Sequence, residues 1–145
     1  MRKTFIYIVL FVIIIISVFV AKYYEYKQNK RNVDQYNVKY LQYIDKEIYG
    51  IDIATLINKA VDNNERTFVK KNEKGKYIQN DENSINIEIK INDEEEGKIY
   101  SMETLYGGGM EQFVEYYELI KFKSCKIEYN SIGKIKYILF EQISS

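Results

Sequence analysis

Four consecutive carboxylates at residues 93–96, followed by Gly97, are the densest group of side chains that could bind a cation. Calcium binds oxygen ligands of this kind. Consecutive side chains point in different directions, however, and the segment lacks the alternating ligands and the distant glutamate of a calcium-binding loop. We therefore predict a solvated hairpin tip whose charges protect a sheet from edge pairing, and no metal site.

Three consecutive glycines, Gly107, Gly108 and Gly109, stand directly before a predicted helix. Bare amides at a helix N-terminus can bind phosphate. No lysine or arginine follows in the first turns, and Glu111 already places a negative charge there. We interpret the glycines as a tight strand-to-helix turn with positive φ angles. Their exposed backbone would still let a protein partner or a ligand approach closely.

The chain contains 15 tyrosines against 7 phenylalanines and no tryptophan. Tyrosine-rich surfaces bind protein partners because each ring combines a wide contact area with a hydroxyl group. Most of the rings fall on predicted inner faces, where we expect core packing, whereas Tyr106 and Tyr116 are expected to be exposed beside the glycines. The predicted partner contact therefore comprises Tyr106, Gly107, Gly108, Gly109 and Tyr116.

Several classes of chemistry are excluded by residues that the chain lacks. Without histidine there is no histidine-based nucleophile activation or acid–base catalysis and no histidine-containing metal site. The chain also lacks a nucleophile elbow, a Ser-x-x-Lys sequence and a nucleotide-binding loop. We predict a non-catalytic protein without a cofactor. A pair of glycosidase-type carboxylates, far apart in the sequence, is the catalytic alternative that stays open.

Cys125 is the only cysteine, so the chain forms neither an internal disulfide nor a cysteine-only zinc site. The residues around it alternate as in a strand, which turns Cys125 toward the same side as Ile127 and Tyr129. We predict that Cys125 is a small buried apolar residue and not a reactive thiol.

The charge balance excludes a protein that binds nucleic-acid duplexes. Basic and acidic residues both number 21, and Arg2 and Lys3 lie before the apolar segment described next, so residues 22–145 have a net charge of −2. Neutralising a row of phosphates requires an excess of cations. We therefore expect no nucleic-acid partner.

Residues 5–21 form an uncharged apolar segment. As a helix with about 1.5 Å per residue, they would cover roughly 26 Å, enough to cross the hydrocarbon core of a bilayer. We predict a single-pass membrane anchor. The alternative is a cleavable export signal with Arg2 and Lys3 as its basic region. Its apolar region would usually be shorter, roughly 7–15 residues, and bulky Phe19 stands where cleavage after Ala21 needs a small residue.

Tyrosines and cations follow the apolar segment in the order typical of a membrane interface, with rings at headgroup depth and cations just beyond. The predicted lipid contacts are Lys22, Tyr23, Tyr24, Tyr26, Lys27, Lys30 and Arg31. A basic N-terminus followed by an apolar segment resembles an export signal, so we expect the C-terminal domain outside the cytoplasm. The count of cations on the two sides of the segment favours the opposite orientation, with a cytoplasmic-facing regulatory domain.

Two helices are predicted after the anchor. Apolar and aromatic residues recur at steps of three and four over residues 22–49, which predicts an amphipathic stem that continues the anchor and ends at Gly50. Asp52 is placed to cap a second helix that extends through Asn63. The buried face of this second helix is expected to comprise Ile53, Ala54, Ile57, Ala60 and Val61.

The apolar period then changes to two, which is typical of strands. Residues 67–71 and 76–78 predict a short hairpin. The segment 84–92 predicts a strand with one buried face, and residues 98–106 predict its antiparallel partner. The expected buried face of the first of these strands consists of Ile85, Ile87, Ile89 and Ile91.

A third helix and a closing hairpin complete the predicted domain. Met110, Phe113, Val114 and Tyr117 have helical spacing, which predicts a helix of about ten residues across the sheet. This order of elements indicates an α+β fold with an antiparallel sheet. The predicted closing hairpin comprises residues 124–130 and 134–142, and the predicted domain bounds are 1–21 for the anchor, 22–49 for the stem and 50–145 for the α+β domain.

A membrane helix that runs into an amphipathic stem, followed by an antiparallel sheet, resembles the layout of type IV pilin-like and pseudopilin proteins. In that family a glycine precedes the apolar segment and a glutamate is its fifth residue, whereas Thr4 and Val9 occupy these positions here. The resemblance implies a minor subunit of a surface or secretion assembly.

The leading expectation is a membrane-anchored protein whose small α+β domain binds protein partners. The alternative is a membrane-tethered ligand-binding or hydrolytic domain that uses Asp or Glu near the three glycines. A pocket with two facing carboxylates would favour a hydrolytic domain, whereas an apolar, tyrosine-lined surface would favour partner binding.

Overall fold

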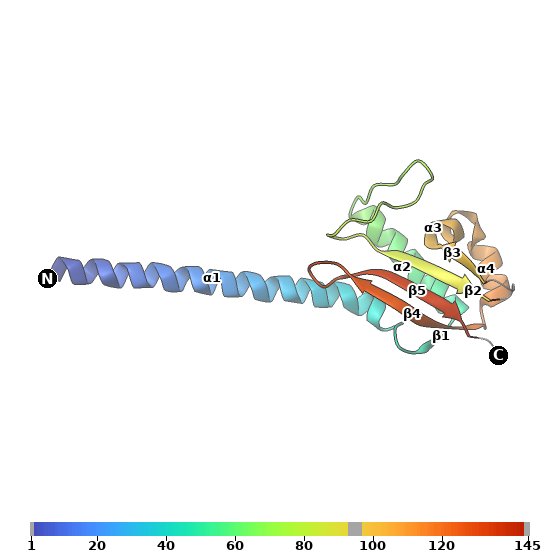
Figure 1. Cartoon of the computed structure of the whole chain (residues 1–145), viewed down its shortest axis with the longest axis horizontal. Helices are drawn as coiled ribbons and strands as arrows, with labels where there is room; N and C mark the ends of the chain where they lie inside the picture. The colour runs from blue at the N-terminus through green and yellow to red at the C-terminus, as the bar shows by residue number, and fades with distance from the viewer. Residues whose placement is uncertain (1, 93–96, 144–145) are drawn as a thin grey trace. The chain divides into compact units, whose positions relative to one another are not determined.

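A computed structural model of the chain describes residues 2–92 and 97–143. The chain forms two compact units, Met1–Gln35 and Tyr36–Ser145. The fold is α+β, as predicted, with a long N-terminal helix, shorter helices and a five-stranded sheet (Figure 1). The carboxylates at residues 93–96 lie outside the described residues, so the hairpin tip there stays a prediction.

The first unit is a single helix, the N-terminal part of α1 (Arg2–Leu41). Residues 5–21 are all exposed, although none carries a charge. The hydroxyl of Ser17 donates a hydrogen bond to the Ile13 carbonyl oxygen at 2.8 Å, so even this polar group is satisfied inside the helix. Among the described residues, α1 is the one helix long and apolar enough to cross a membrane. Helices that are apolar all round are found inside large proteins or in bilayers.

The helix continues past the apolar segment as predicted, but it ends at Leu41 and not near Tyr49. Residues 47–49 form a short strand, β1 (Glu47–Tyr49), so the prediction that the stem extends to residue 49 was wrong. The spacing of four between the buried residues Ile44 and Ile48 suggested a helix, but these residues belong to a turn and a strand.

Within the described part of the chain, five strands form one mixed sheet in the order β1-β4-β5-β2-β3. All neighbouring pairs are antiparallel except β2 and β5, which are parallel, so the predicted purely antiparallel sheet was wrong at this pair. The chain passes from β3 through the helical segment to β4, and β5 then fills the centre of the sheet beside β2 (Figure 1). The bounds are β2 (Asn86–Ile91), β3 (Lys98–Ser101), β4 (Lys121–Tyr129) and β5 (Ile135–Gln142).

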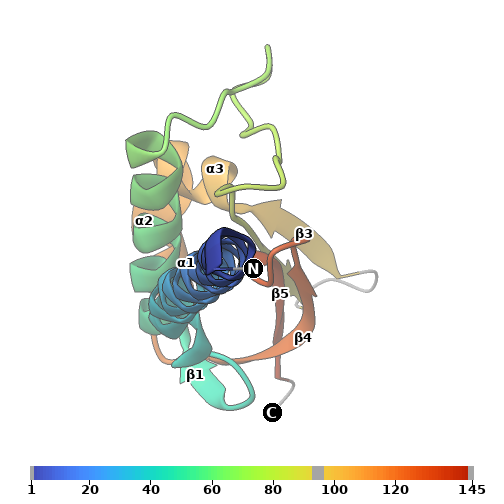
Figure 2. The same ribbon diagram turned by 90° about the vertical axis from the view of Figure 1, so that its left-hand side faces the viewer.

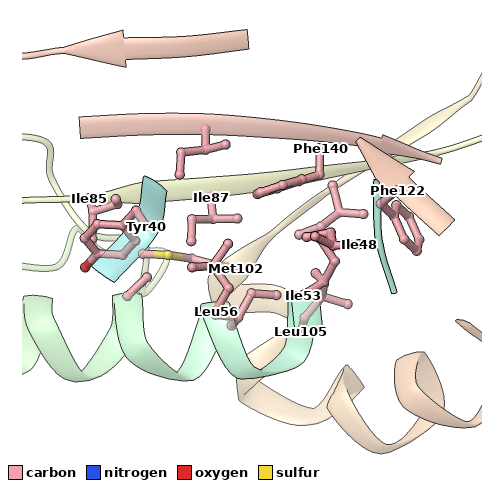
Figure 3. Packing of buried hydrophobic residues seen from close by; sticks show 14 of the residues in the cluster. Tyr40, Ile48, Ile53, Leu56, Ile85, Ile87, Met102, Leu105, Phe122 and Phe140 are labelled. Atoms are coloured by element: carbon pink, nitrogen blue, oxygen red, sulfur yellow. The ribbon is translucent and has the colours of Figure 1, made fainter. Parts of the chain in front are cut away.

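Helix α2 (Gly50–Arg66) lies along one face of the sheet (Figure 2). Gly50 begins this helix and does not end the preceding one, and the carboxylate of Asp52 accepts a hydrogen bond from the Tyr49 amide at 3.1 Å. The predicted buried face of α2 is confirmed, since Ile53 and Ile57 are fully buried. They belong to the same core cluster as the four predicted isoleucines, all of which are buried: Ile85 lies just before β2, and Ile87, Ile89 and Ile91 lie within it. Figure 3 shows Ile53 of α2 together with Ile85 and Ile87 in this core.

Two buried asparagines attach helices to the starts of strands. Asn64 of α2 donates to the Ile85 carbonyl oxygen at 2.8 Å and accepts from the Ile85 amide at 2.9 Å. Asn37 near the end of α1 likewise donates to the Gly133 carbonyl oxygen at 2.8 Å and accepts from the Ile135 amide at 2.9 Å. Each side chain therefore satisfies backbone groups that would otherwise be buried without a partner.

Candidate functional site

The segment around the three glycines is helical. β3 ends at Ser101, and α3 (Met102–Thr104), a π-helical turn η1 (Leu105–Gly109) and α4 (Met110–Tyr117) follow without interruption. The prediction of a strand over residues 98–106 was therefore wrong beyond residue 101. Met102 and Leu105 point their side chains into the core at a helical spacing, which a strand could not achieve.

The glycines do not form the predicted strand-to-helix turn. They belong to η1 and mark a kink between α3 and α4, and only Gly108 has a positive φ, of 158°. A Cβ atom at Gly107 would meet nothing within 4 Å, so this position is open to solvent. The backbone of Gly108 is not helical, so the segment is a break between two helical pieces and not a regular π-helix.

A hollow of about 390 Å³ opens beside this kink. We call it the tyrosine pocket. Its walls come from the ends of β2 and β3 and from the inner side of η1 and α4, which the fold brings together from distant parts of the sequence. The residues that line it are Ile91, Tyr100, Thr104, Leu105, Gly109, Gln112, Phe113, Tyr116 and Tyr117.

Stacked aromatic rings make the α4 wall of the tyrosine pocket rigid. Phe113 is buried, and its ring stacks on that of Tyr117 with centroids 5.4 Å apart. Both rings also pack against Phe122 of β4, at 6.0 Å and 6.4 Å. Tyr116, by contrast, is 70% exposed and forms part of the rim. The pocket therefore has a preformed apolar floor and an exposed aromatic side chain at its mouth.

The tyrosine pocket has no acid–base machinery among the described residues. No Asp, Glu, Lys or Arg lines it there, and its Thr104 hydroxyl already shares a hydrogen bond of 3.0 Å with Ser101. The nearby carboxylate of Glu103 accepts a hydrogen bond from the Tyr77 amide at 3.0 Å and so holds a loop in place. An apolar wall with a few hydroxyl and amide groups suits the binding of an apolar or aromatic group.

Four of the five predicted partner-contact residues line two hollows, whereas Gly107 lines neither of them. Tyr116 and Gly109 line the tyrosine pocket, whereas Tyr106 and Gly108 line a shallower hollow together with Met110 and Glu111. Tyr106 and Tyr116 are exposed, as predicted. The deeper wall residues, including Tyr100 and Phe113, were assigned only to the core. The sequence feature that could have indicated a pocket wall is the group of aromatic residues Phe113, Tyr116 and Tyr117, which follows three glycines.

The predicted membrane-interface residues all lie exposed on the helix of the first unit. Lys22 forms an ion pair with Glu25 at 3.0 Å, and the rings of Tyr23 and Tyr24 meet edge to face with centroids 6.1 Å apart. A second group on one side of this helix surrounds a shallow hollow and consists of Tyr24, Lys27, Gln28 and Arg31. Beyond the Lys22–Glu25 pair, the cations Lys27, Lys30 and Arg31 follow within the next ten residues.

The sheet face that α2 does not cover carries paired charges. Lys90 and Glu141 lie 2.6 Å apart, and Lys121 and Glu47 lie 2.7 Å apart. Lys90 lowers the pKa of the Glu141 carboxyl, and Lys121 lowers that of Glu47. Within these two pairs the charges neutralise one another, as is usual for ion pairs on a solvated surface.

Cys125 is exposed, so the prediction of a buried cysteine was wrong. A β-bulge between Ser124 and Lys126 shifts the register of β4 against β5 and breaks the alternation on which that prediction depended. Desolvation by the surrounding residues and the negative charge of Glu141 raise the pKa of the thiol. Among the described residues, no three potential ligands (His, Cys, Asp or Glu) gather closely enough to hold a metal ion.

Comparisons with protein-family models, with curated proteins and with solved structures gave no match for this chain.

Proposed function

We propose that this chain is a single-pass membrane-anchored binding protein. Residues 5–21 would span a bilayer, and the unit Tyr36–Ser145 would bind a protein partner by accepting an apolar or aromatic side chain in the tyrosine pocket. The observation that carries the proposal is this pocket, a preformed aromatic hollow of about 390 Å³ without a charged group among its described lining residues.

The membrane anchor is supported by the first unit. Its apolar side chains are exposed on every side of the helix, and Phe19, for example, is 72% exposed. In water this surface would be strongly unfavourable, at roughly 25 cal/mol for each Å² of apolar area. Tyrosines and cations follow from Lys22 to Arg31, where they would meet lipid headgroups.

Partner binding is supported by the surroundings of the tyrosine pocket. Ile99, Tyr106, Tyr116 and Leu119 are large exposed side chains on or next to the elements that form the pocket. A preformed hollow surrounded by exposed apolar side chains is typical of the central part of a protein–protein interface, where one buried anchor contributes much of the affinity.

Within its unit, the tyrosine pocket lies at one end of β2. Ile91, at the end of β2, lines the pocket. The start of β2 lies beside Asn64, which bonds to Ile85, and near the β4–β5 turn, whose Gly133 bonds to Asn37. The chain enters this unit at Tyr36, next to Asn37. Within this unit, the tyrosine pocket therefore lies at the opposite end of β2 from Tyr36 and Asn37.

A second candidate function is the binding of a small apolar ligand. The volume of the pocket falls within the range of small-molecule sites, roughly 300–1,000 Å³. A hydrolytic domain has less support, because no described carboxylate lines the pocket. The surface or secretion assembly and the extracytoplasmic orientation remain part of the proposal.

Gln112→Glu tests the pocket with a nearly isosteric change that places a carboxylate on its wall. A photocrosslinker at Tyr116 of the full chain in its native membrane should capture a protein, and Gln112→Glu should reduce that capture strongly because a charge is costly in an apolar interface. Gln35→Glu, an exposed helical position that does not line the pocket, is the matched control and should leave capture unchanged. Equal capture by both variants would contradict the proposed site.

Two further measurements separate the alternatives. Native mass spectrometry that detects a small molecule on the purified chain, together with no crosslinked protein, would favour the small-ligand candidate. Extraction of the full chain from membranes by alkaline carbonate would contradict the anchor itself.

A further inference from the structure

The segment that follows α2 combines exposed apolar side chains with a concentration of positive charge. Residues 66–78, which we call the basic hairpin, contain five cations and one carboxylate, whereas residues 22–145 as a whole carry a net charge of −2. The segment folds back on itself at a single bridge between Lys71 and Tyr77, as the sequence predicted. The Ile78 amide donates to the Lys70 carbonyl oxygen at 2.8 Å, so both arms are held together.

Phe68 is held in an unusual position at the start of this hairpin. Its side chain is 90% exposed and its φ is +56°, a left-handed conformation that favours glycine. The backbone on both sides is fixed, because the Phe68 amide donates to the Glu65 carbonyl oxygen at 3.1 Å and the Val69 amide donates to that of Asn64 at 2.9 Å. These two hydrogen bonds form the cap that ends α2, and this cap accounts for the left-handed backbone. The cap does not require a phenyl ring in solvent, so the exposed ring is the feature that folding leaves unexplained.

Three of the hairpin's cations are free in the part of the chain that the structure describes. Arg66 pairs with Asp62 at 2.9 Å, and Lys71 pairs with Glu65 at 3.6 Å. Neither an ion pair nor a side-chain hydrogen bond engages the remaining three there, which are Lys70, Lys74 and Lys76. The ring of Phe68 and the half-exposed side chain of Ile78 lie on the same short hairpin as these lysines.

The basic hairpin emerges at the end of the unit where the chain enters. After the hairpin, the loop continues to Asp81, whose carbonyl oxygen accepts a hydrogen bond from the Asn130 side chain at 3.1 Å. In the adjoining β4–β5 turn, the Gly133 carbonyl oxygen accepts a hydrogen bond from the Asn37 side chain. Ile132 at that turn is a further exposed apolar residue, 55% accessible. The base of the hairpin, where the Val69 amide bonds to Asn64 and Asn64 bonds to Ile85, therefore lies by the start of β2, whereas the tyrosine pocket lies by its end.

We propose that the basic hairpin docks on the anionic surface of the bilayer that holds the N-terminal anchor. The ring of Phe68 inserts among the headgroups, and Lys70, Lys74 and Lys76 contact lipid phosphates. Amphipathic rings and cations are the residues that bind this interface. The inference rests on the proposed anchor, which makes the docking intramolecular, so even a weak contact is populated.

Tryptophan fluorescence tests this proposal, because the chain contains no tryptophan of its own. Phe68→Trp in the full chain gives a single reporter, to be compared in vesicles of phosphatidylcholine and in vesicles that also contain phosphatidylglycerol. We expect a blue shift and weaker acrylamide quenching with the anionic lipid, both reversed by salt. Ile78→Trp provides the same readout if Phe68→Trp does not fold. Leu119→Trp, exposed near the pocket, should not respond.

Charge-matched double variants separate specific docking from general attraction to anionic lipid. In the Phe68→Trp chain, Lys70→Gln with Lys74→Gln should abolish the shift. Lys46→Gln with Lys123→Gln removes the same charge from exposed positions outside the hairpin and should preserve it. Equal loss in both double variants would overturn the proposal.

The outcomes also distinguish the hairpin from the anchor. A chain that carbonate removes from both kinds of vesicle would overturn the anchor and the docking together. The docking alone would be overturned by a Phe68→Trp chain that stays embedded but whose tryptophan fluorescence is the same in both lipids. That result would leave an acidic protein surface as the partner of the free lysines.

Discussion

Gly50, the first residue of α2, lies against the backbone of Tyr117, the last residue of α4. A Cβ atom at Gly50 would come within 2.0 Å of the Tyr117 carbonyl oxygen. The Gly50 amide donates to the Ile120 carbonyl oxygen at 3.0 Å in the same contact. Because Tyr117 lines the tyrosine pocket, the absence of a side chain at Gly50 helps to fix the position of a pocket wall.

Gly50→Ala should therefore disturb both the fold and the pocket. The added methyl group forces α2 and α4 apart, and overpacking of this kind destabilises a protein by about 1–3 kcal/mol. We expect a loss of this size in the free energy of unfolding, measured by denaturant titration of the full chain in detergent, together with weaker crosslinking at Tyr116. Gly107→Ala, where a Cβ atom has open space, should change neither.

Asn64→Ala should be among the most destabilising substitutions of a polar residue. It leaves both the amide and the carbonyl group of Ile85 buried without partners, at about 1–3 kcal/mol for each group. The amide of Ile85 should also exchange its hydrogen faster. Asn58→Ala, on the exposed side of the same helix, should leave stability unchanged or slightly raised. Similar stability of the two variants would show that the Asn64 bridge is not needed.

Phe68→Gly should stabilise the folded domain while it weakens membrane docking. Glycine accepts the left-handed backbone without the strain of a Cβ atom, which amounts to about 1 kcal/mol. Phe68→Ala keeps the Cβ atom and should not produce this gain. If thermal unfolding of the full chain in zwitterionic lipid gave the same midpoint for Phe68→Gly and Phe68→Ala, the strain assigned to Phe68 would be absent.

The Lys90–Glu141 pair should contribute stability that disappears in acid. Lys90 and Asn92 hold the pKa of Glu141 below its ordinary value, which is about 4.3 in an unfolded chain. A carboxyl group with a lowered pKa stabilises the fold above the unfolded pKa, and this contribution is lost as the pH falls through the folded pKa. Glu141→Gln should therefore be slightly less stable than the wild type at neutral pH and equally stable in strong acid. A difference that persists in acid would contradict this assignment.

Exposed Cys125 makes orientation measurable in the unmodified chain. With the domain outside the cytoplasm, a membrane-impermeant maleimide should label intact cells, and mildly alkaline buffer should speed the reaction because the pKa of the thiol is raised. Cys125→Ala should give no label. Labelling that requires lysis would place the domain in the cytoplasm and favour the regulatory alternative.

Local patterns were sufficient to predict much of the fold. The alternating isoleucines of β2 and the apolar face of α2 are buried as the sequence indicated, because each pattern matches the period of its own element. The apolar segment at residues 5–21, which contains neither glycine nor proline, is helical as well. These features depend on neighbours within a few residues.

Features that depend on distant partners were not predictable in this way. β1 is a strand because β4 pairs with it through Ile48 and Phe122, and the four-residue step from Ile44 to Ile48 gave no sign of that pairing. Cys125 is exposed because the bulge in β4 is set by its register with β5. Within the candidate site, Tyr106 and Tyr116 were predicted to be exposed beside the glycines. Tyr100 was not assigned to the site, because its place in the pocket depends on β3 meeting α4.

The central position of β5 determines when the sheet can be completed during synthesis. β5 lies between β4 and β2, yet it is the last of the five strands to be synthesised. Until residue 142 has left the ribosome, β2 lacks its parallel neighbour, and the backbone groups along that edge of β2 have no strand to pair with. The apolar N-terminal segment leaves the ribosome long before β5 does. We therefore expect the membrane-targeting machinery to act on a nascent chain in which the central strand of the sheet has not yet been made.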